Sequence, residues 1–161
     1  ISIIDTDVEM IDAAREFDFK VYYGDGTRLD ILHAAGAGRA RVVLVCVDNV
    51  QDATRIVELM KAEFPLVPVL ARANDRRHTL DLIRAGADFH IRETFESSLI
   101  LGGKAVQMMG ADQEEVATLT SRIRERDGAR LQAELANGEL AGRAFFSGKA
   151  SSQGPASGHE V

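Results

Sequence analysis

Strand-like and helix-like segments alternate along residues 1–110, and this alternation constrains the fold more than any other feature. Short apolar runs are separated by stretches in which apolar residues recur every three or four positions. No hairpin signal joins one run to the next, so each run must return to the sheet through a helix, as a right-handed parallel crossover. The pattern predicts an α/β fold with a Rossmann-like, doubly wound parallel sheet. The predicted strands are 1–4, 21–23, 41–47, 68–71 and 88–91.

Local signals predict where several helices begin and end. Asp7 suits the N-cap of a first helix, and Thr27 or Asp30 suits the start of a second, with Gly36 at its C-terminal end. A helix over 51–64 should stop at Pro65, which has no backbone N–H to donate.

The strand and Gly-x-Gly-x-x-Gly turn that open a Rossmann fold are missing from this sequence. The chain starts directly on the apolar run Ile1-Ser-Ile-Ile4, without an initiator Met, and this run suits a buried second strand. We therefore expect a fragment whose phosphate-binding turn lies outside it. Removing a central strand and its helix would expose apolar faces of the neighbouring elements, so we expect the missing part to exist in a parent protein.

The composition changes after Gly110. Residues 111–146 are charged, with a thin apolar stripe at helical spacing, and predict a C-terminal helical extension with a candidate break at Asp127-Gly128. Residues 147–161 are rich in Ser, Gly, Ala and Gln, which predicts a disordered tail. The predicted organisation is thus an N-terminally incomplete nucleotide-binding domain over 1–110, the extension and the tail.

Charge and cysteine content exclude several classes of function. A net charge of −6 argues against nucleic-acid binding, which requires an excess of Lys and Arg. The single cysteine, Cys46, lies in an apolar run and is predicted to be a buried thiol, and no Cys or His cluster has metal-site spacing. No apolar stretch reaches the roughly 20 residues of a membrane span, so the chain itself is expected to be soluble.

Acidic residues follow three of the predicted strands, at the sheet edge where α/β proteins bind ligands. Asp5, Asp25 and Asp48 occupy these positions. Each alone is explained as a helix cap, but the set, with Gly24 and Gly26 allowing close backbone approach, favours a nucleotide site. The predicted nucleotide-binding residues are Asp5, Thr6, Gly24, Asp25, Gly26, Thr27, Val47 and Asp48.

Arginines follow the last two strands at the same edge. Arg72 and Arg92 could grip carboxylates or phosphates bidentately, or could pair with Asp75 or Glu93, and the sequence leaves these alternatives level. His78, on a nearby helix turn, is predicted to face solvent or cap the helix. No nucleophile motif or acid/base pair specifies catalysis, so we predict a sensor and not an enzyme.

These motifs resemble the RCK or KTN (TrkA-N type) regulatory domain of Kef-type glutathione-regulated potassium-efflux antiporters. The resemblance covers about 1–110. It rests on Asp5-Thr-Asp7, Val21-Tyr-Tyr-Gly-Asp-Gly-Thr27, Val47-Asp-Asn49, Ala71-Arg-Ala-Asn-Asp75 and Arg92-Glu-Thr-Phe-Glu96.

The resemblance implies a domain that gates K⁺/H⁺ antiport from the cytoplasmic face of the bacterial inner membrane. It implies AMP or NAD(H) at the acidic edge, and glutathione as a regulatory ligand with Arg72 as its partner and Arg92 as a weaker candidate. It further implies a homodimer, a membrane antiporter domain in the same parent chain and an ancillary flavoprotein subunit. Asn74 departs from the family pattern, where an Arg is common. The alternatives are an NAD-dependent oxidoreductase fragment and a soluble regulator of potassium uptake.

Overall fold

The computed structural model describes residues 1–17, 19–138 and 141. The chain divides into two compact units, Ile1–Ser98 and the residues from Leu99 onward. None of the described helices combines the length and the apolar content needed to cross a bilayer.

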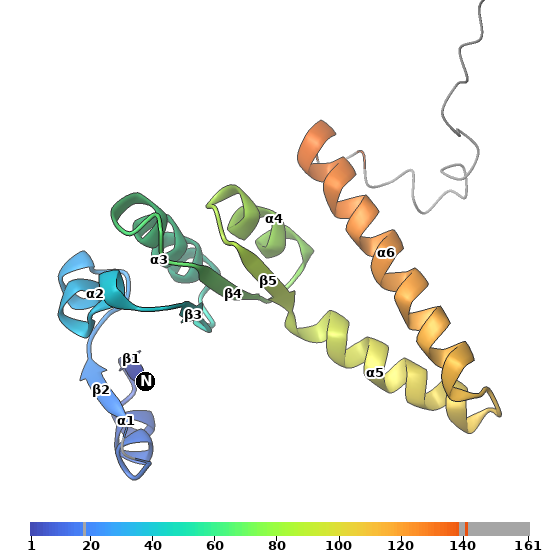
Figure 1. Ribbon diagram of the computed structural model, residues 1–161, viewed down its shortest axis with the longest axis horizontal. Coiled ribbons are helices and arrows are strands. Elements are labelled where there is room, and N and C mark those ends of the chain that lie inside the picture. The colour runs from blue at the N-terminus through green and yellow to red at the C-terminus, as the bar shows by residue number, and fades with distance from the viewer. Residues whose placement is uncertain (18, 139–140, 142–161) are drawn as a thin grey trace, which may run out of the picture. The chain divides into compact units, whose positions relative to one another are not determined.

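Strands and helices alternate strictly through the first unit, which confirms the predicted α/β fold (Figure 1). A helix follows each strand, and it provides the crossover connection that parallel pairing of the strands requires. In chain order the elements are β1 (Ser2–Asp5), α1 (Val8–Arg15), β2 (Lys20–Tyr23), α2 (Leu29–Ala35), the short helix η1 (Ala37–Arg39), β3 (Val43–Val45), α3 (Val50–Glu63), β4 (Val69–Ala73), α4 (Arg76–Arg84) and β5 (Phe89–Arg92).

All strand pairs are parallel, but they form two sheets. One sheet pairs β1 with β2, and the other has the order β3-β4-β5. In the doubly wound order the first strand of the fold stands between the strands that correspond to β1 and β3. The break therefore falls where the missing strand is predicted, and that strand itself stays a prediction.

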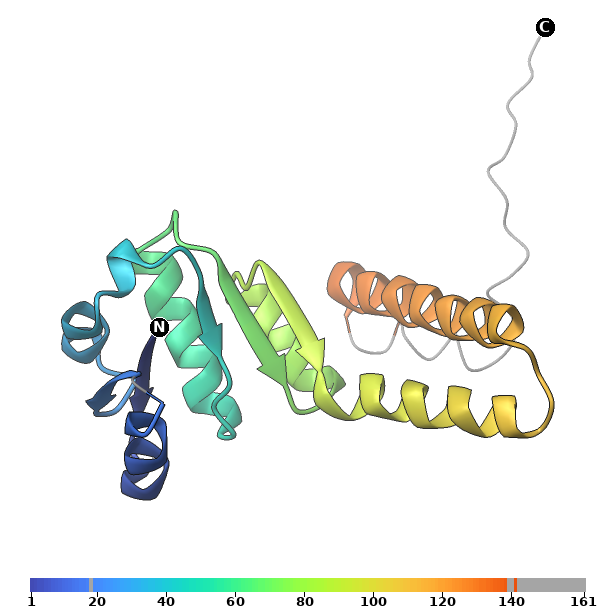
Figure 2. The ribbon, with the colours of Figure 1, turned by 60° about the horizontal axis from the view of Figure 1, so that its bottom comes forward.

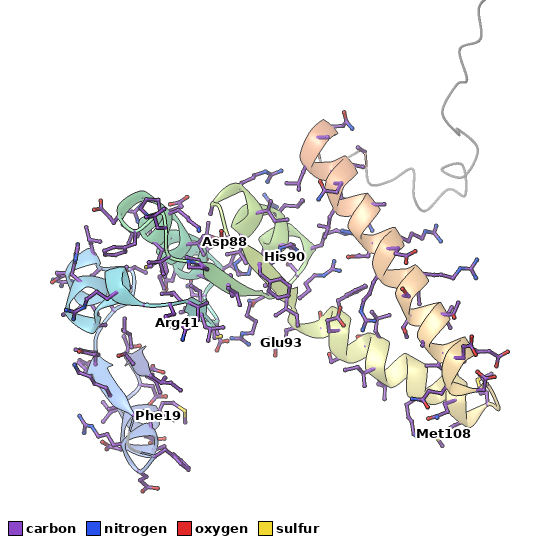
Figure 3. The ribbon with its side chains drawn as sticks, viewed as in Figure 1. Phe19, Arg41, Asp88, His90, Glu93 and Met108 are labelled. Atoms are coloured by element: carbon purple, nitrogen blue, oxygen red, sulfur yellow. The ribbon has the colours of Figure 1, made fainter. Side chains whose placement is uncertain are left out.

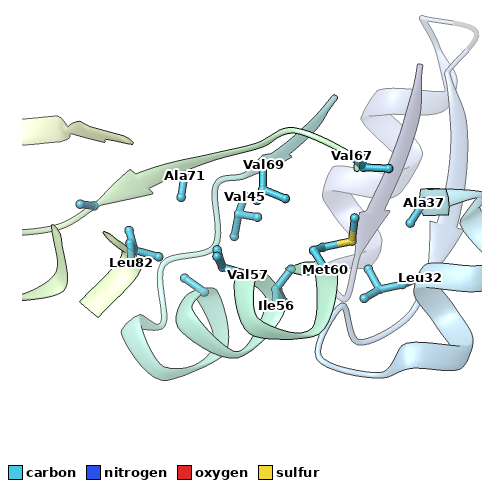
Figure 4. Close-up of a cluster of buried hydrophobic side chains, with 12 residues drawn as sticks. Leu32, Ala37, Val45, Ile56, Val57, Met60, Val67, Val69, Ala71 and Leu82 are labelled. Atoms are coloured by element: carbon cyan, nitrogen blue, oxygen red, sulfur yellow. The ribbon is translucent and has the colours of Figure 1, made fainter. Parts of the chain in front are cut away.

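The core of the first unit lies where α3 and α4 cover one face of the β3-β4-β5 sheet (Figures 2 and 4). The apolar stripe of α3 provides Val57 and Met60, which are fully buried, and the sheet provides Val69 and Ala71. Leu82 of α4 completes the cluster. Each buried CH₂ contributes about 0.8 kcal/mol, so this face supplies much of the driving force for folding.

The strand predicted over 41–47 is shorter than expected and half exposed. Only Val43–Val45 form β3, and Leu44 is 68% exposed while Val45 is 2% exposed. Cys46 is also exposed, so the prediction of a buried thiol is wrong. The reason is that β3 is an edge strand with helices on one face only. Ile1 precedes β1 and is 91% exposed, and no residue of β1 itself is fully buried, so the expected burial of that run on both faces is not seen.

The predicted helix ends are mostly confirmed. The Asp7 carboxylate accepts the backbone N–H groups of Glu9 and Met10 and so caps α1. Gly36 ends α2 with a left-handed φ of 86°, a conformation that favours glycine. The N-cap of α2 is Arg28, so the predicted start at Thr27 or Asp30 is off by one or two residues. The helix α3 ends at Glu63, two residues before Pro65, as predicted.

Two helices make up the described part of the second unit. α5 (Glu93–Met108) begins in the first unit, and α6 (Gln113–Asn137) opens with a capping box between Asp112 and Glu115. The expected break at Asp127-Gly128 is wrong, because one glycine costs a helix only about 1 kcal/mol and good helix formers surround it. A Cβ on Gly103 would lie 3.1 Å from Val116 Cγ1, so the helices pack closely there. The predicted tail and the end of the extension lie outside the described residues.

Candidate functional site

The residues predicted for the site fall into two groups in the structure. The first group stands where β1 and β2 end, and consists of Asp5, Thr6, Gly24, Asp25, Gly26 and Thr27. The second stands where β3 and β4 end, and consists of Val47, Asp48 and Arg72. The two groups belong to separate sheets.

Asp5 joins the ends of β1 and β2. Its backbone carbonyl accepts the Gly24 N–H at 3.0 Å, and its Oδ1 accepts the Asp7 N–H at 2.9 Å. The side chain thus orients the N-cap of α1 while remaining partly exposed at the carboxyl end of a parallel strand. A carboxylate in this position can accept hydrogen bonds from ribose hydroxyls.

Asp25 and Thr27 form a turn closed by their own side chains. Oδ1 of Asp25 accepts the Thr27 hydroxyl at 2.7 Å and the Thr27 N–H at 2.8 Å. These two hydrogen bonds, the hydroxyl first, hold the pKa of Asp25 below its ordinary value. The carboxylate is therefore ionised at neutral pH and held in a defined place.

Gly24 and Gly26 leave room for side chains of the protein itself. A Cβ on Gly24 would lie 3.0–3.2 Å from three atoms of Ile31 in α2, and one on Gly26 would lie 3.2 Å from Ile56 Cδ1 in α3. Neither glycine has a positive φ. Packing therefore accounts for both glycines, and close approach of a ligand stays a prediction.

Arg72 is the centre of the second group. Its Nη2 donates to the Cys46 carbonyl at 2.8 Å and to the Asp48 carboxylate, and its Nη1 donates to Glu93 Oε2 at 2.6 Å. The bond to Asp48, above all, raises the pKa of Arg72. The ion pair with Glu93, one of the alternatives left open by the sequence, is thus present, and Glu93 lies at the start of α5 (Figure 3).

Asn74 and His78 hold the turn after β4, and the sequence interpretation missed their role. Nδ2 of Asn74 donates to the Asp48 carbonyl at 3.0 Å, and its backbone N–H donates to His78 Nδ1 at 3.2 Å. Asp75 caps α4 by accepting the His78 N–H at 2.8 Å. The sequence signal that could have indicated this contact is the four-residue spacing of Asn74 and His78 on either side of the N-cap Asp75.

His78 is buried, with 1% exposure, so the prediction that it faces solvent is wrong, whereas its Nδ1 accepts the Asn74 N–H just before α4, which agrees with the capping alternative. It lies in α4, on the side that packs on β4 and α3. Burial lowers its pKa. Its Nε2 is buried and has no hydrogen-bond partner within the described part of the chain.

The structure does not bring Arg92 to Arg72. Arg72 is paired in register with Ile91, whereas Arg92 is paired with Ala73 and so points to the opposite face of the sheet. The Arg92 guanidinium lies 4.3 Å from the centre of the Phe95 ring. Among the described residues, no three His, Cys, Asp or Glu side chains are grouped to hold a metal ion.

Comparison with known proteins adds a family and several relatives. The TrkA-N domain family matches residues 1–93. A glutathione-regulated potassium-efflux system protein of Haemophilus influenzae is 41% identical over 138 residues, which are 86% of this chain and 22% of that protein. The glutathione-regulated potassium-efflux system protein KefC of Salmonella paratyphi B is 36% identical over 137 residues, 85% of this chain and 22% of that protein.

Solved structures match the same region. The Kef C-terminal domain of Shewanella denitrificans, in an AMP-bound form, is 28% identical with a TM-score of 0.69, covering 87% of this chain and 96% of that one. The TrkA-N domain of the Escherichia coli inner membrane protein ybaL is 21% identical with a TM-score of 0.59, covering 62% of this chain and 74% of that one, and supports the fold alone. The chain spans about a fifth of the length of the two curated relatives.

Proposed function

The chain belongs to the TrkA-N domain family, and we propose that it is the part of a potassium-efflux protein that senses nucleotide and glutathione. Membership confirms the predicted resemblance and makes this a regulatory domain, not an enzyme, so the oxidoreductase alternative is set aside. The observation that carries the proposal is the acidic edge formed by Asp5 and the Asp25–Thr27 turn.

The nucleotide is AMP or NAD(H), bound at the ends of β1 and β2. Asp5 accepts hydrogen bonds from the ribose hydroxyls, and the Asp25–Thr27 turn offers a carboxylate and a hydroxyl to the adenosine part. Thr6 adds a second hydroxyl beside Asp5, and Val47 and Asp48, which follow β3, complete the set of proposed nucleotide-binding residues. The AMP-bound form of the similar Shewanella domain supports this assignment.

Glutathione binds at Arg72. The Arg72 side chain is 26% exposed at the end of β4, where it can reach a ligand, and glutathione carries two carboxylates that require cationic partners. Arg92 is the weaker partner, because its guanidinium lies on the other face of the sheet and packs on Phe95.

The remaining parts of the proposal concern the parent protein. The domain gates a K⁺/H⁺ antiporter encoded in the same chain, on the cytoplasmic face of the bacterial inner membrane, as a homodimer with an ancillary flavoprotein subunit. The names of the relatives support potassium efflux. A soluble regulator of potassium uptake is the alternative, and apolar spans of about 20 residues in the natural full-length chain would distinguish the two.

The nucleotide assignment is tested by calorimetric titration of the full-length protein with AMP and with NADH. We expect Asp5→Ala to weaken the affinity for the preferred nucleotide at least tenfold, about 1.4 kcal/mol, because it removes the ribose acceptor. Asp12→Ala is the matched control, since Asp12 is also exposed and acidic but pairs with Arg15 on α1. Unchanged affinity in Asp5→Ala would reject the assignment of the pocket.

A further inference from the structure

Arg72 is already occupied by two carboxylates of the protein. Asp48 follows β3 and Glu93 begins α5, so the Arg72 guanidinium in β4 links these two segments. Neither carboxylate is buried, because the Asp48 side chain is 93% exposed and the Glu93 side chain 55% exposed. Exposed ion pairs of this kind are weak, so a ligand can displace them.

The guanidinium has few hydrogen atoms left for a ligand carboxylate. A carboxylate held in the strong bidentate mode needs two adjacent N–H donors. Both hydrogens of Nη2 are used, by the Cys46 carbonyl and by Asp48, and one hydrogen of Nη1 is used by Glu93. Nε is buried and cannot be reached from solvent. The departure of Glu93 leaves both Nη2 hydrogens occupied, so it does not create a bidentate site. It frees the Nη1 hydrogen that Glu93 holds, and a ligand carboxylate that takes this hydrogen replaces Glu93.

Glu93 is the carboxylate whose departure has a structural consequence. It is the first residue of α5, and its backbone carbonyl accepts the Ser97 hydroxyl at 2.9 Å within the first turn. α5 continues along the chain from the first compact unit into the second. Asp48, by contrast, lies in a loop and is held in addition by Asn74, which donates to its carbonyl.

We propose that Glu93 sets the affinity of the Arg72 site by competing with the ligand carboxylate, and that its release passes ligand occupancy to α5. This inference rests on the proposed assignment of glutathione to Arg72, and it adds Glu93 as the residue that competes with glutathione for Arg72. In the absence of ligand, Arg72 is paired with the Glu93 carboxylate. A ligand carboxylate that binds Arg72 at the same place replaces Glu93.

The test uses the full-length protein reconstituted in liposomes, with glutathione as the probe. Glu93→Gln keeps the size of the side chain and removes the competing charge. We expect it to bind glutathione about fivefold more tightly, which corresponds to about 1 kcal/mol. We also expect the difference in potassium efflux between the glutathione-bound and glutathione-free states to shrink, because Glu93 no longer couples Arg72 to α5.

Two comparisons separate competition from a general change of charge. Glu63→Gln removes one exposed carboxylate of the same unit, at the end of α3, and should leave the affinity within twofold of wild type. In the Arg72→Gln background, Glu93→Gln should no longer tighten binding. A damaged fold would weaken binding, so a gain in affinity is not explained by misfolding.

The outcomes distinguish this inference from the function on which it rests. If wild type binds no glutathione, the glutathione assignment and the inference both fail, while AMP binding is judged by its own titration. If wild type binds glutathione and Glu93→Gln binds equally or more weakly, the assignment stands and only the competition is overturned.

Discussion

Replacing Gly24 with Ala tests whether the glycines of the nucleotide edge serve the ligand or the protein. The new Cβ would meet Ile31 Cδ1 at 3.0 Å, Cγ2 at 3.1 Å and Cγ1 at 3.2 Å. All three atoms belong to one side chain on α2, so either Ile31 leaves its rotamer or α2 moves away from β2. The structure therefore predicts a defect in stability and not in ligand contact.

The size of the defect follows from the packing. Overfilling a packed site costs about 1–3 kcal/mol, and Ile31 is partly buried and retains some freedom to shift, so we expect about 1–2 kcal/mol. Ile31→Ala removes all three contacting atoms. In the Gly24→Ala/Ile31→Ala double variant the clash disappears. The loss in free energy of unfolding in the double variant should therefore be about 1 kcal/mol smaller than the sum of the losses in the two single variants.

The assay is urea denaturation of the purified protein, combined with AMP titration of the folded protein. Gly128→Ala is the matched control, because a Cβ there meets nothing within 4 Å and alanine stabilises a helix interior by about 1 kcal/mol. Additive single effects would refute the clash with Ile31. Loss of AMP affinity in Gly24→Ala without loss of stability would show that the glycine serves the ligand.

Three further predictions follow from burial and capping. Leu82→Ala, at a fully buried position, should lower the free energy of unfolding by about 2–5 kcal/mol, whereas Leu66→Ala, at 96% exposure, should change it by less than about 0.5 kcal/mol in the same urea titration. His78 has a folded pKa below its ordinary 6.5, so its contribution to stability is complete above pH 6.5 and falls by up to about 1.4 kcal/mol per pH unit as the pH drops towards the folded pKa. Urea midpoints at pH 7.5 and 5.5 should show a smaller pH dependence in His78→Gln, and an equal one would exclude His78 as the source. Asp112→Ala should cost α6 about 1 kcal/mol, measured as lost helicity on heating, and an unchanged melting curve would contradict the capping box.

Some features of the fold were determined by short-range patterns in the sequence. The order of elements follows from apolar periodicity, and the ends of α1 and α2 follow from Asp7 and Gly36, because capping depends on residues within a few positions of each other. The family followed from motifs that combine strand ends with specific residues, and the match over residues 1–93 confirms it.

Burial was decided by tertiary structure. The sequence of 41–47 is apolar throughout, so nothing in it says that Leu44 and Cys46 would face outward on an edge strand. His78 reads as a polar surface residue, yet it lies in the core because α4 packs its side of the helix on β4 and α3. Burial depends on which neighbour covers a face, and that neighbour is far away in the sequence.

The acidic edge shows the same division between sequence and structure. The sequence by itself determined that Asp5, Asp25 and Asp48 follow strands, because an apolar run that is followed by an acid is a local pattern. The partner of Asp25 is Thr27, two residues away and within the same turn, whereas only the tertiary structure decided that Asp48 is held by Arg72. The partner of Asp48 lies 24 residues away in the chain, and no local pattern specifies a contact at that separation.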